Sequence, residues 1–170
     1  SGNVATVRDP LLREVHFTYD GDGRVLTQEL PDLRVSQFAY DANGNLTALS
    51  PPGRPAHGFD HTPVDLANEY DPPAVGLPED RTLYSHNLDR QLELATRPDG
   101  QTVDFVYGAT SGRLESTVVP RGTYTYSYET SSGNLASIAD PDGGTLTFEY
   151  DGSLPTAVTW SGTVAGAIEL

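Results

Sequence analysis

Hydrophobic and polar residues alternate along several short segments of the chain. In residues 124–128 (YTYSY) tyrosines occupy every second position, and residues 103–107 (VDFVY) and 146–150 (LTFEY) follow the same period. A period of two places successive side chains on opposite faces of a β-strand. No apolar set recurs at helical spacing for even three turns. The pattern therefore predicts an all-β chain of short strands.

Most of these segments end in a tyrosine, and the tyrosines recur at a nearly regular interval. They are Tyr19, Tyr40, Tyr84, Tyr107, Tyr128 and Tyr150, with spacings of 21, 44, 23, 21 and 22 residues. The long interval holds one degenerate unit, in which Phe59 or His61 takes the place of the tyrosine. Such self-similarity marks a tandem repeat architecture. We expect repeats at 13–33, 34–54, 55–80, 81–100, 101–122, 123–144 and 145–163, with a truncated unit at 164–170.

Each repeat contains two turns. A glycine and then a leucine follow the tyrosine at similar distances, namely Gly23, Gly44, Gly112 and Gly133, and Leu46, Leu92, Leu114 and Leu135. The second strand ends in a proline-containing turn such as residues 98–100 (PDG). Glycine adopts the positive φ that short hairpin loops require, and proline cannot donate to a strand ladder. The predicted unit is thus a hairpin of two neighbouring antiparallel strands.

The charge of the chain narrows the classes of partner. Asp and Glu number 24 against 10 Lys and Arg, which gives a net charge of −14. A polyanion is repelled by phosphate backbones and by anionic lipid surfaces, so nucleic acid is not expected as a partner. The chain has no cysteine and therefore no disulfide framework. No window approaches 18 consecutive apolar residues, so no membrane-spanning helix is expected.

The order of tyrosine, turn, leucine and proline turn resembles the YD repeat of the RHS (rearrangement hotspot) proteins. The best matches are residues 40–53 (YDANGNLTALSPPG), 107–122 (YGATSGRLESTVVPRG) and 128–144 (YETSSGNLASIADPDGG). The resemblance covers essentially the whole chain. It implies tandem hairpins of about 21 residues that form one continuous curved or spiralling sheet, as in a segment of an RHS β-shell.

The resemblance also implies a function. Members of the family include bacterial polymorphic toxins, components of insecticidal toxin complexes and the teneurin receptors. We therefore expect a non-catalytic wall segment that encloses a C-terminal toxin or cargo polypeptide, in a secreted or cell-surface protein. Its partners would be neighbouring repeats of the full-length shell and the enclosed cargo. The alternative is an extracellular adhesion module that binds carbohydrate or protein.

No group of residues predicts a catalytic, cofactor-binding or metal-binding site. His57 and His61 share a face of one strand, but they would lie roughly 13 Å apart, too far to chelate one ion. We expect His16 to face away from the tyrosines. Residues 20–23 (DGDG) resemble the start of a calcium loop but lack its later ligands, so a hairpin turn explains them better. Carboxylate pairs, Glu69 with Asp71 and Glu79 with Asp80, lie in a segment that we predict to be a proline-rich linker, residues 69–80.

The tyrosines have two interpretations. As structural residues they form ladders across neighbouring hairpins, where each pair stabilises by up to about 1 kcal/mol. As functional residues they provide an aromatic face for sugar rings or for an unfolded polypeptide. A single sheet also leaves its edges and one apolar face without cover, so we expect the isolated chain to self-associate.

Overall fold

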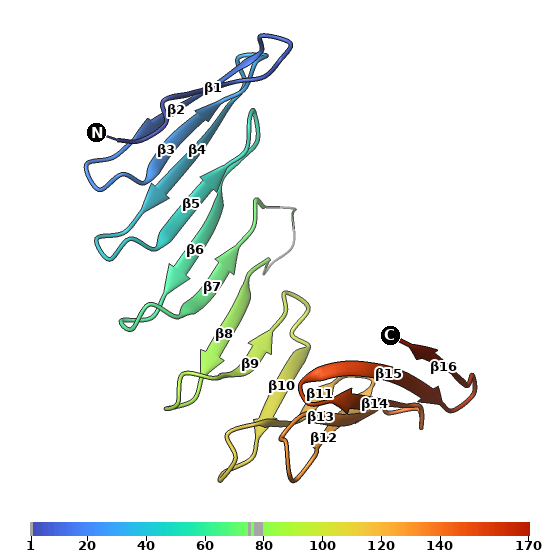
Figure 1. Cartoon of the computed structure of the whole chain (residues 1–170). Helices are drawn as coiled ribbons and strands as arrows, with labels where there is room; N and C mark the ends of the chain where they lie inside the picture. The colour runs from blue at the N-terminus through green and yellow to red at the C-terminus, as the bar shows by residue number, and fades with distance from the viewer. Residues whose placement is uncertain (1, 75, 77–79) are drawn as a thin grey trace. The chain divides into compact units, whose positions relative to one another are not determined.

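The computed structural model describes residues 2–74, 76 and 80–170, and these form strands and turns without a helix (Figure 1). The strands are β1 (Thr6–Arg8), β2 (Glu14–Tyr19), β3 (Val25–Glu29), β4 (Val35–Tyr40), β5 (Leu46–Ser50), β6 (His57–His61), β7 (Ala67–Asp71), β8 (Thr82–His86), β9 (Leu92–Thr96), β10 (Thr102–Tyr107), β11 (Leu114–Val119), β12 (Gly122–Tyr128), β13 (Leu135–Ala139), β14 (Thr145–Asp151), β15 (Leu154–Ser161) and β16 (Gly166–Glu169). Accordingly, the described residues include no helix with the length and hydropathy needed to cross a membrane.

The strands are hydrogen-bonded in the order in which they occur in the chain, from β1 to β16, with no crossover. Every described pair is antiparallel, as in β2 with β3 and β12 with β13. Two compact units can be distinguished, residues 1–84 with 97–99 and residues 85–96 with 100–170. The predicted all-β fold of tandem antiparallel hairpins in one sheet is confirmed.

A β-bulge precedes the last residue of the first strand in hairpin after hairpin. In β2 and β3, Thr18 pairs with Thr27 but Tyr19 pairs with Val25, so the ladder skips one residue. The same skip occurs between residues 39 and 40, 60 and 61, 106 and 107, 127 and 128, and 149 and 150. A bulge bends its strand and re-aims the neighbouring side chain. The tyrosine position is therefore defined by backbone geometry as well as by residue type.

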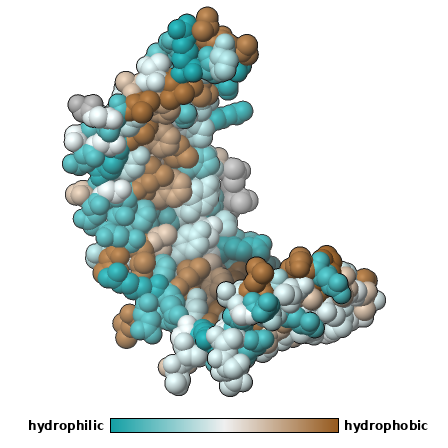
Figure 2. All heavy atoms as spheres, in the orientation of Figure 1, coloured by the Kyte–Doolittle hydropathy of each residue, from teal (hydrophilic) through white to brown (hydrophobic). Residues whose placement is uncertain are grey.

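One face of the sheet carries large apolar side chains and has no second layer above it in the described part of the chain. Strand β12 shows the pattern clearly, because its tyrosines are half-buried while the residues between them are exposed. Directly paired positions such as Phe38 with Leu49 and Phe59 with Tyr70 share this face. No described hydrophobic residue is fully buried. Figure 2 shows hydrophobic side chains gathered over the strands of the first unit. We call the side of the sheet that carries these half-buried tyrosines and phenylalanines the aromatic face.

The predicted linker of residues 69–80 begins too early. Strand β7 extends to Asp71, so Glu69 and Asp71 lie on a strand, where Glu69 pairs with Asp60 and Asp71 with Gly58. Tyr70 also stacks at an angle on Phe59, with 5.5 Å between the ring centroids. Residues 69–71 do not alternate clearly between apolar and polar side chains, so the sequence alone does not indicate a strand there. Pairing with β6 extends β7 to Asp71 despite the acidic sequence. Residues 75 and 77–79, which include Glu79, lie outside the described residues.

Candidate functional site: the tyrosine edge

The turns that follow the tyrosine position form one edge of the hairpins, which we call the tyrosine edge; it comprises residues 20–24, 41–45, 62–66, 87–91, 108–113 and 129–134. In the first of these turns, Oδ1 of Asp20 accepts hydrogen bonds from the amides of Asp22 and Arg24, both at 2.9 Å. The amide of Asp20 donates to the carbonyl of Arg24, and Gly23 takes a φ of 84°. The aspartate thus closes the turn around a left-handed glycine.

Hydrogen bonding lowers the pKa of the turn carboxylates. For Asp20 the largest cause is the hydrogen bond from the Arg24 amide, and the Arg24 guanidinium adds to it through Nε at 2.6 Å. For Asp41 the largest cause of its lowered pKa is the hydrogen bond from the Asn45 side chain. Both carboxylates are therefore structural acceptors held in the charged form. Asp22 also has a partner within this turn, since its Oδ2 lies 3.3 Å from Nη2 of Arg24.

The proline turns at the opposite edge use the same geometry. Oδ1 of Asp140 accepts from the amides of Asp142 and Gly144 at 2.7 and 2.9 Å, and Gly143 has a φ of 88°. In four other turns a residue with a side chain occupies the left-handed position, namely Leu12, Leu33, Asp65 and Arg90 at 63° to 65°. The same five-residue turn therefore occurs at both ends of the strands.

The hydroxyls of four tyrosines connect a hairpin to the chain segment that precedes it. Tyr40 donates to the carbonyl of Val25 at 3.1 Å, and Tyr107 donates to that of Leu92 at 2.9 Å. The same bond joins Tyr19 to Val4 and Tyr128 to Leu114, both at 2.8 Å. The donor thus lies 14 or 15 residues after its acceptor, on the next strand pair along the chain. These tyrosines hold neighbouring hairpins together.

A second connection runs in the other direction, from the residue after the left-handed position of a turn to the following turn. We call these side chains the link residues; they are Arg24, Asn45, Gln91, Arg113 and Asn134. Their amide or guanidinium groups donate to Asp41 O at 3.2 Å, Asp65 Oδ1 at 2.7 Å, Gly112 O at 2.7 Å and, from Asn134, Gly152 O at 2.7 Å. Arg113 instead stacks over the Tyr128 ring, 5.2 Å from its centroid.

The link residues also explain why glycine recurs in the turns. A Cβ on Gly44 would lie 3.3 Å from Nη1 of Arg24, and a Cβ on Gly133 would overlap the guanidinium of Arg113. Each of these glycines therefore provides space for the link residue of the previous repeat, in addition to its positive φ. Our sequence reasoning missed the link residues, although the recurring Gly-Arg and Gly-Asn dipeptides were a visible signal.

Two of the tyrosine positions are occupied by histidine. His61 follows the bulge of β6 and pairs with Ala67, just as Tyr40 pairs with Leu46. The amide of Asn87 donates to the carbonyl of Gln91, as that of Asp20 does to Arg24, so His86 immediately precedes its turn. Tyr84, to which the sequence reasoning gave this place, lies two residues earlier on β8. Among the described residues, Nδ1 of His61 and of His86 are the buried side-chain polar atoms without a hydrogen-bond partner.

The other histidines have structural partners. His16 is about half exposed, with Nδ1 3.1 Å from Oγ1 of Thr6, and Nδ1 of His57 lies 2.7 Å from the hydroxyl of Tyr70. In the part of the chain that the structure describes, no group of three His, Asp or Glu side chains is placed to hold a metal ion. The sequence reasoning assigned no catalytic or cofactor-binding residue. The tyrosine edge is thus an arrangement for joining hairpins.

An open sheet of hairpins joined by tyrosines and turn side chains is the arrangement of a YD-repeat shell segment. The model of the teneurin YD-shell family matches residues 3–168. The chain therefore belongs to the teneurin YD-shell family. The resemblance to YD-repeat proteins that the sequence indicates is confirmed. The comparison with curated proteins gave no match.

Solved structures of toxin complexes share this fold. The TcdB2-TccC3 complex without its hypervariable C-terminal region superposes with a TM-score of 0.69 at 18% identity, over 92% of this chain and 10% of that one. The Photorhabdus luminescens Tc holotoxin pore gives a TM-score of 0.68 at 20% identity, over 92% and 9%. This chain spans about a tenth of the length of those proteins. At these identities the likeness shows the fold alone.

Proposed function

We propose that the chain is a stretch of non-catalytic wall in a larger YD shell that encloses a cargo polypeptide, in a secreted or cell-surface protein. The observation that carries this proposal is the direction of its contacts. The tyrosine hydroxyls and the link residues join neighbouring hairpins, while no described hydrophobic side chain is buried in a core. A chain that is stabilised along one axis and has no second layer is suited to a wall.

The order of the strands supports the same proposal, because consecutive strands pair in chain order without a crossover. An edge strand presents unpaired amides and carbonyls to which a further strand can add. In a longer shell, neighbouring repeats would pair with both edges. The wall would then act by steric exclusion, because a hydrogen-bonded sheet keeps proteases and partners from its contents.

Photo-crosslinking in the full-length protein tests this function. Phe38 and Ala39 are adjacent in β4 and lie on opposite faces, because Phe38 is half-buried and Ala39 is exposed. A photoreactive benzoylphenylalanine would replace one residue or the other. If the sheet is a wall around cargo, the enclosed segment of the polypeptide will resist trypsin in the native state. Only one of the two positions, the one on the inner face, will then crosslink to that segment. Such crosslinks from both positions, or from neither, would contradict enclosure.

A further inference from the structure

A concave site in the second unit has features that the wall function does not use. A cavity of about 440 Å³ lies on the aromatic face beside the turn of residues 140–144. Its floor crosses four neighbouring strands, where Ile138 pairs with Leu146 and Leu146 pairs with Trp160. Tyr124 lines the other end of this floor. At about 4.8 Å per strand, the floor is roughly 14 Å long.

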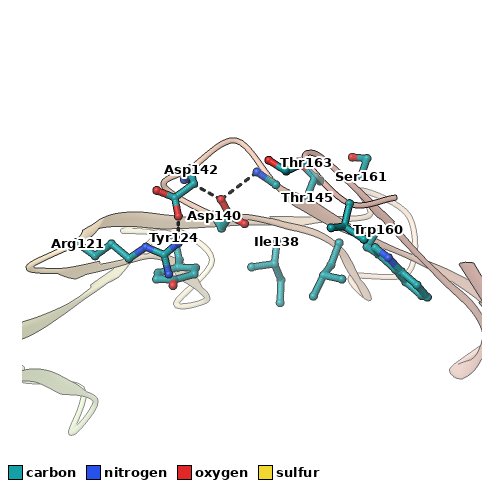
Figure 3. A pocket seen from close by; sticks show the side chains of 12 residues that line it. Arg121, Tyr124, Ile138, Asp140, Asp142, Thr145, Trp160, Ser161 and Thr163 are labelled. Atoms are coloured by element: carbon teal, nitrogen blue, oxygen red, sulfur yellow. Dashed lines mark hydrogen bonds and ion pairs between the residues drawn. The ribbon is translucent and has the colours of Figure 1, made fainter. Parts of the chain in front are cut away.

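The indole of Trp160 packs closely against strand β16. Trp160 pairs with Gly166 of β16, and a Cβ on Gly166 would overlap Cζ2 and Cε2 of the indole. The ring therefore rests on backbone that only glycine leaves free. The indole is thus held against β16, and Trp160 also lines the cavity. Figure 3 shows the side chains of Tyr124, Ile138 and Trp160 pointing to the same side of the sheet.

Polar groups surround this apolar floor. Asp140 uses Oδ1 to hold its turn, while Oδ2 accepts no hydrogen bond within the described residues. Asp142 forms an ion pair with Arg121, and both residues line the cavity (Figure 3). Carboxylate and guanidinium groups beside an aromatic surface are suited to a ligand with an apolar face and a rim of hydroxyls.

We propose that this cavity binds a neutral oligosaccharide, with one pyranose ring stacked on Trp160 and its hydroxyls hydrogen-bonded to Asp140 and the Arg121–Asp142 pair. Charge favours a neutral ligand over an acidic one. The two aspartates outnumber the single arginine at the site, and the whole chain carries −14, so sulfated or carboxylated sugars are repelled. The proposal does not depend on whether the shell encloses a cargo.

Fluorescence provides a direct assay, because Trp160 is the only tryptophan in the chain. Cellotetraose, maltotetraose and chitotetraose would each be titrated into the 170-residue chain, with a heparin tetrasaccharide and a neutral apolar tetrapeptide as competing classes of ligand. We expect a saturable change in emission with at least one of the three neutral sugars. No saturable change with any of them up to their solubility limits overturns the proposal. Binding of the heparin fragment or the peptide alone also overturns it.

Three variants separate the site from the fold. Gly166→Ala keeps the fluorescent indole but displaces it from the backbone, so affinity should fall about tenfold or more. Asp140→Asn keeps an acceptor for the turn amides and should weaken sugar binding by a smaller factor. The matched control is Gly21→Ala, because a Cβ there meets nothing within 4 Å and its φ is ordinary. Circular dichroism checks the fold. Unchanged affinity in both site variants would assign the signal to another surface.

Discussion

Replacing His61 by tyrosine should strengthen the joint, meaning the set of side-chain contacts, between the hairpin of β4 and β5 and the hairpin of β6 and β7. The bulge before residue 61 matches those before Tyr19 and Tyr40, so a tyrosine there would have the same backbone orientation. By the spacing of 15 residues seen for Tyr40, its hydroxyl would reach the carbonyl of Leu46. The substitution also removes the buried Nδ1 of His61, which has no partner in the described residues.

The size of the effect follows from the two changes. A net hydrogen bond contributes about 1 kcal/mol, and removing an unpaired buried polar atom restores about 1 kcal/mol more. We therefore expect His61→Tyr to raise the free energy of unfolding by about 1–2 kcal/mol. For a chain of 170 residues each kcal/mol corresponds to roughly 2–4 °C in Tm. Thermal and urea unfolding followed by circular dichroism measure both quantities.

Three further variants isolate the hydroxyl. His61→Phe removes Nδ1 without adding a hydroxyl, so it should give only about half of the gain. Tyr40→Phe removes the bond to Val25 and should cost about 1 kcal/mol. Tyr84→Phe is the matched control, because the Tyr84 hydroxyl forms no inter-repeat bond among the described residues. A His61→Tyr variant no more stable than His61→Phe would refute the reasoning.

Three other predictions concern the backbone, the turn carboxylates and the sheet edge. Arg90→Gly should raise the free energy of unfolding by about 1 kcal/mol, because Arg90 has a φ of 63°, and Gly143→Ala should lower it by a similar amount. Urea unfolding measures both changes. Effects of the same sign in the two variants would contradict the backbone explanation. The pKa of Asp41 is lower in the folded chain than in the unfolded one, so its carboxylate stabilises the fold above about pH 4, and this stability is lost as the pH falls through the folded-state pKa. The urea midpoint should therefore fall less between about pH 6 and pH 2 in Asp41→Asn than in the parent chain. Parallel curves for the two chains would count against this explanation. Finally, the chain should associate with rising concentration in light scattering, and Ile168→Lys on the edge strand β16 should weaken this association, whereas a constant mass of 18.2 kDa would exclude it.

The strands could be predicted from the sequence because alternation is a local property. Residues 124–128 and 146–150 show it, and both lie on strands. The register at Tyr84 could not be read in the same way. The turn of residues 87–91 has no glycine, and Arg90 takes the left-handed position instead. Without a glycine to mark the turn, the sequence indicates Tyr84 as the residue before it, although His86 is the residue that precedes the turn.

The link residues show a different limit of sequence reasoning. The dipeptides Gly23-Arg24 and Gly44-Asn45 are visible, but the partner of Arg24 is a carbonyl 17 residues further along. Which turn lies beside which depends on the stagger of neighbouring hairpins, and no single repeat contains that information. The cavity at Trp160 has the same origin, because its floor combines side chains from four strands. Contacts between repeats appear only when the hairpins are placed side by side.

The joints between hairpins differ in strength, and the histidines show where they are weakest. A repeat array is stabilised mainly by contacts between neighbours, so the loss of one joint is not compensated by distant repeats. Where a tyrosine hydroxyl and a link residue both cross a joint, as Tyr40 and Arg24 do, two independent connections must break before it opens. At His61 no tyrosine hydroxyl crosses among the described residues. The side-chain amides of Asn43 and Asn45 both donate to the same oxygen of Asp65, and a buried nitrogen of His61 lacks a partner. Hydrogen exchange should therefore be faster in β6 than in β4, and His61→Tyr should reduce that difference.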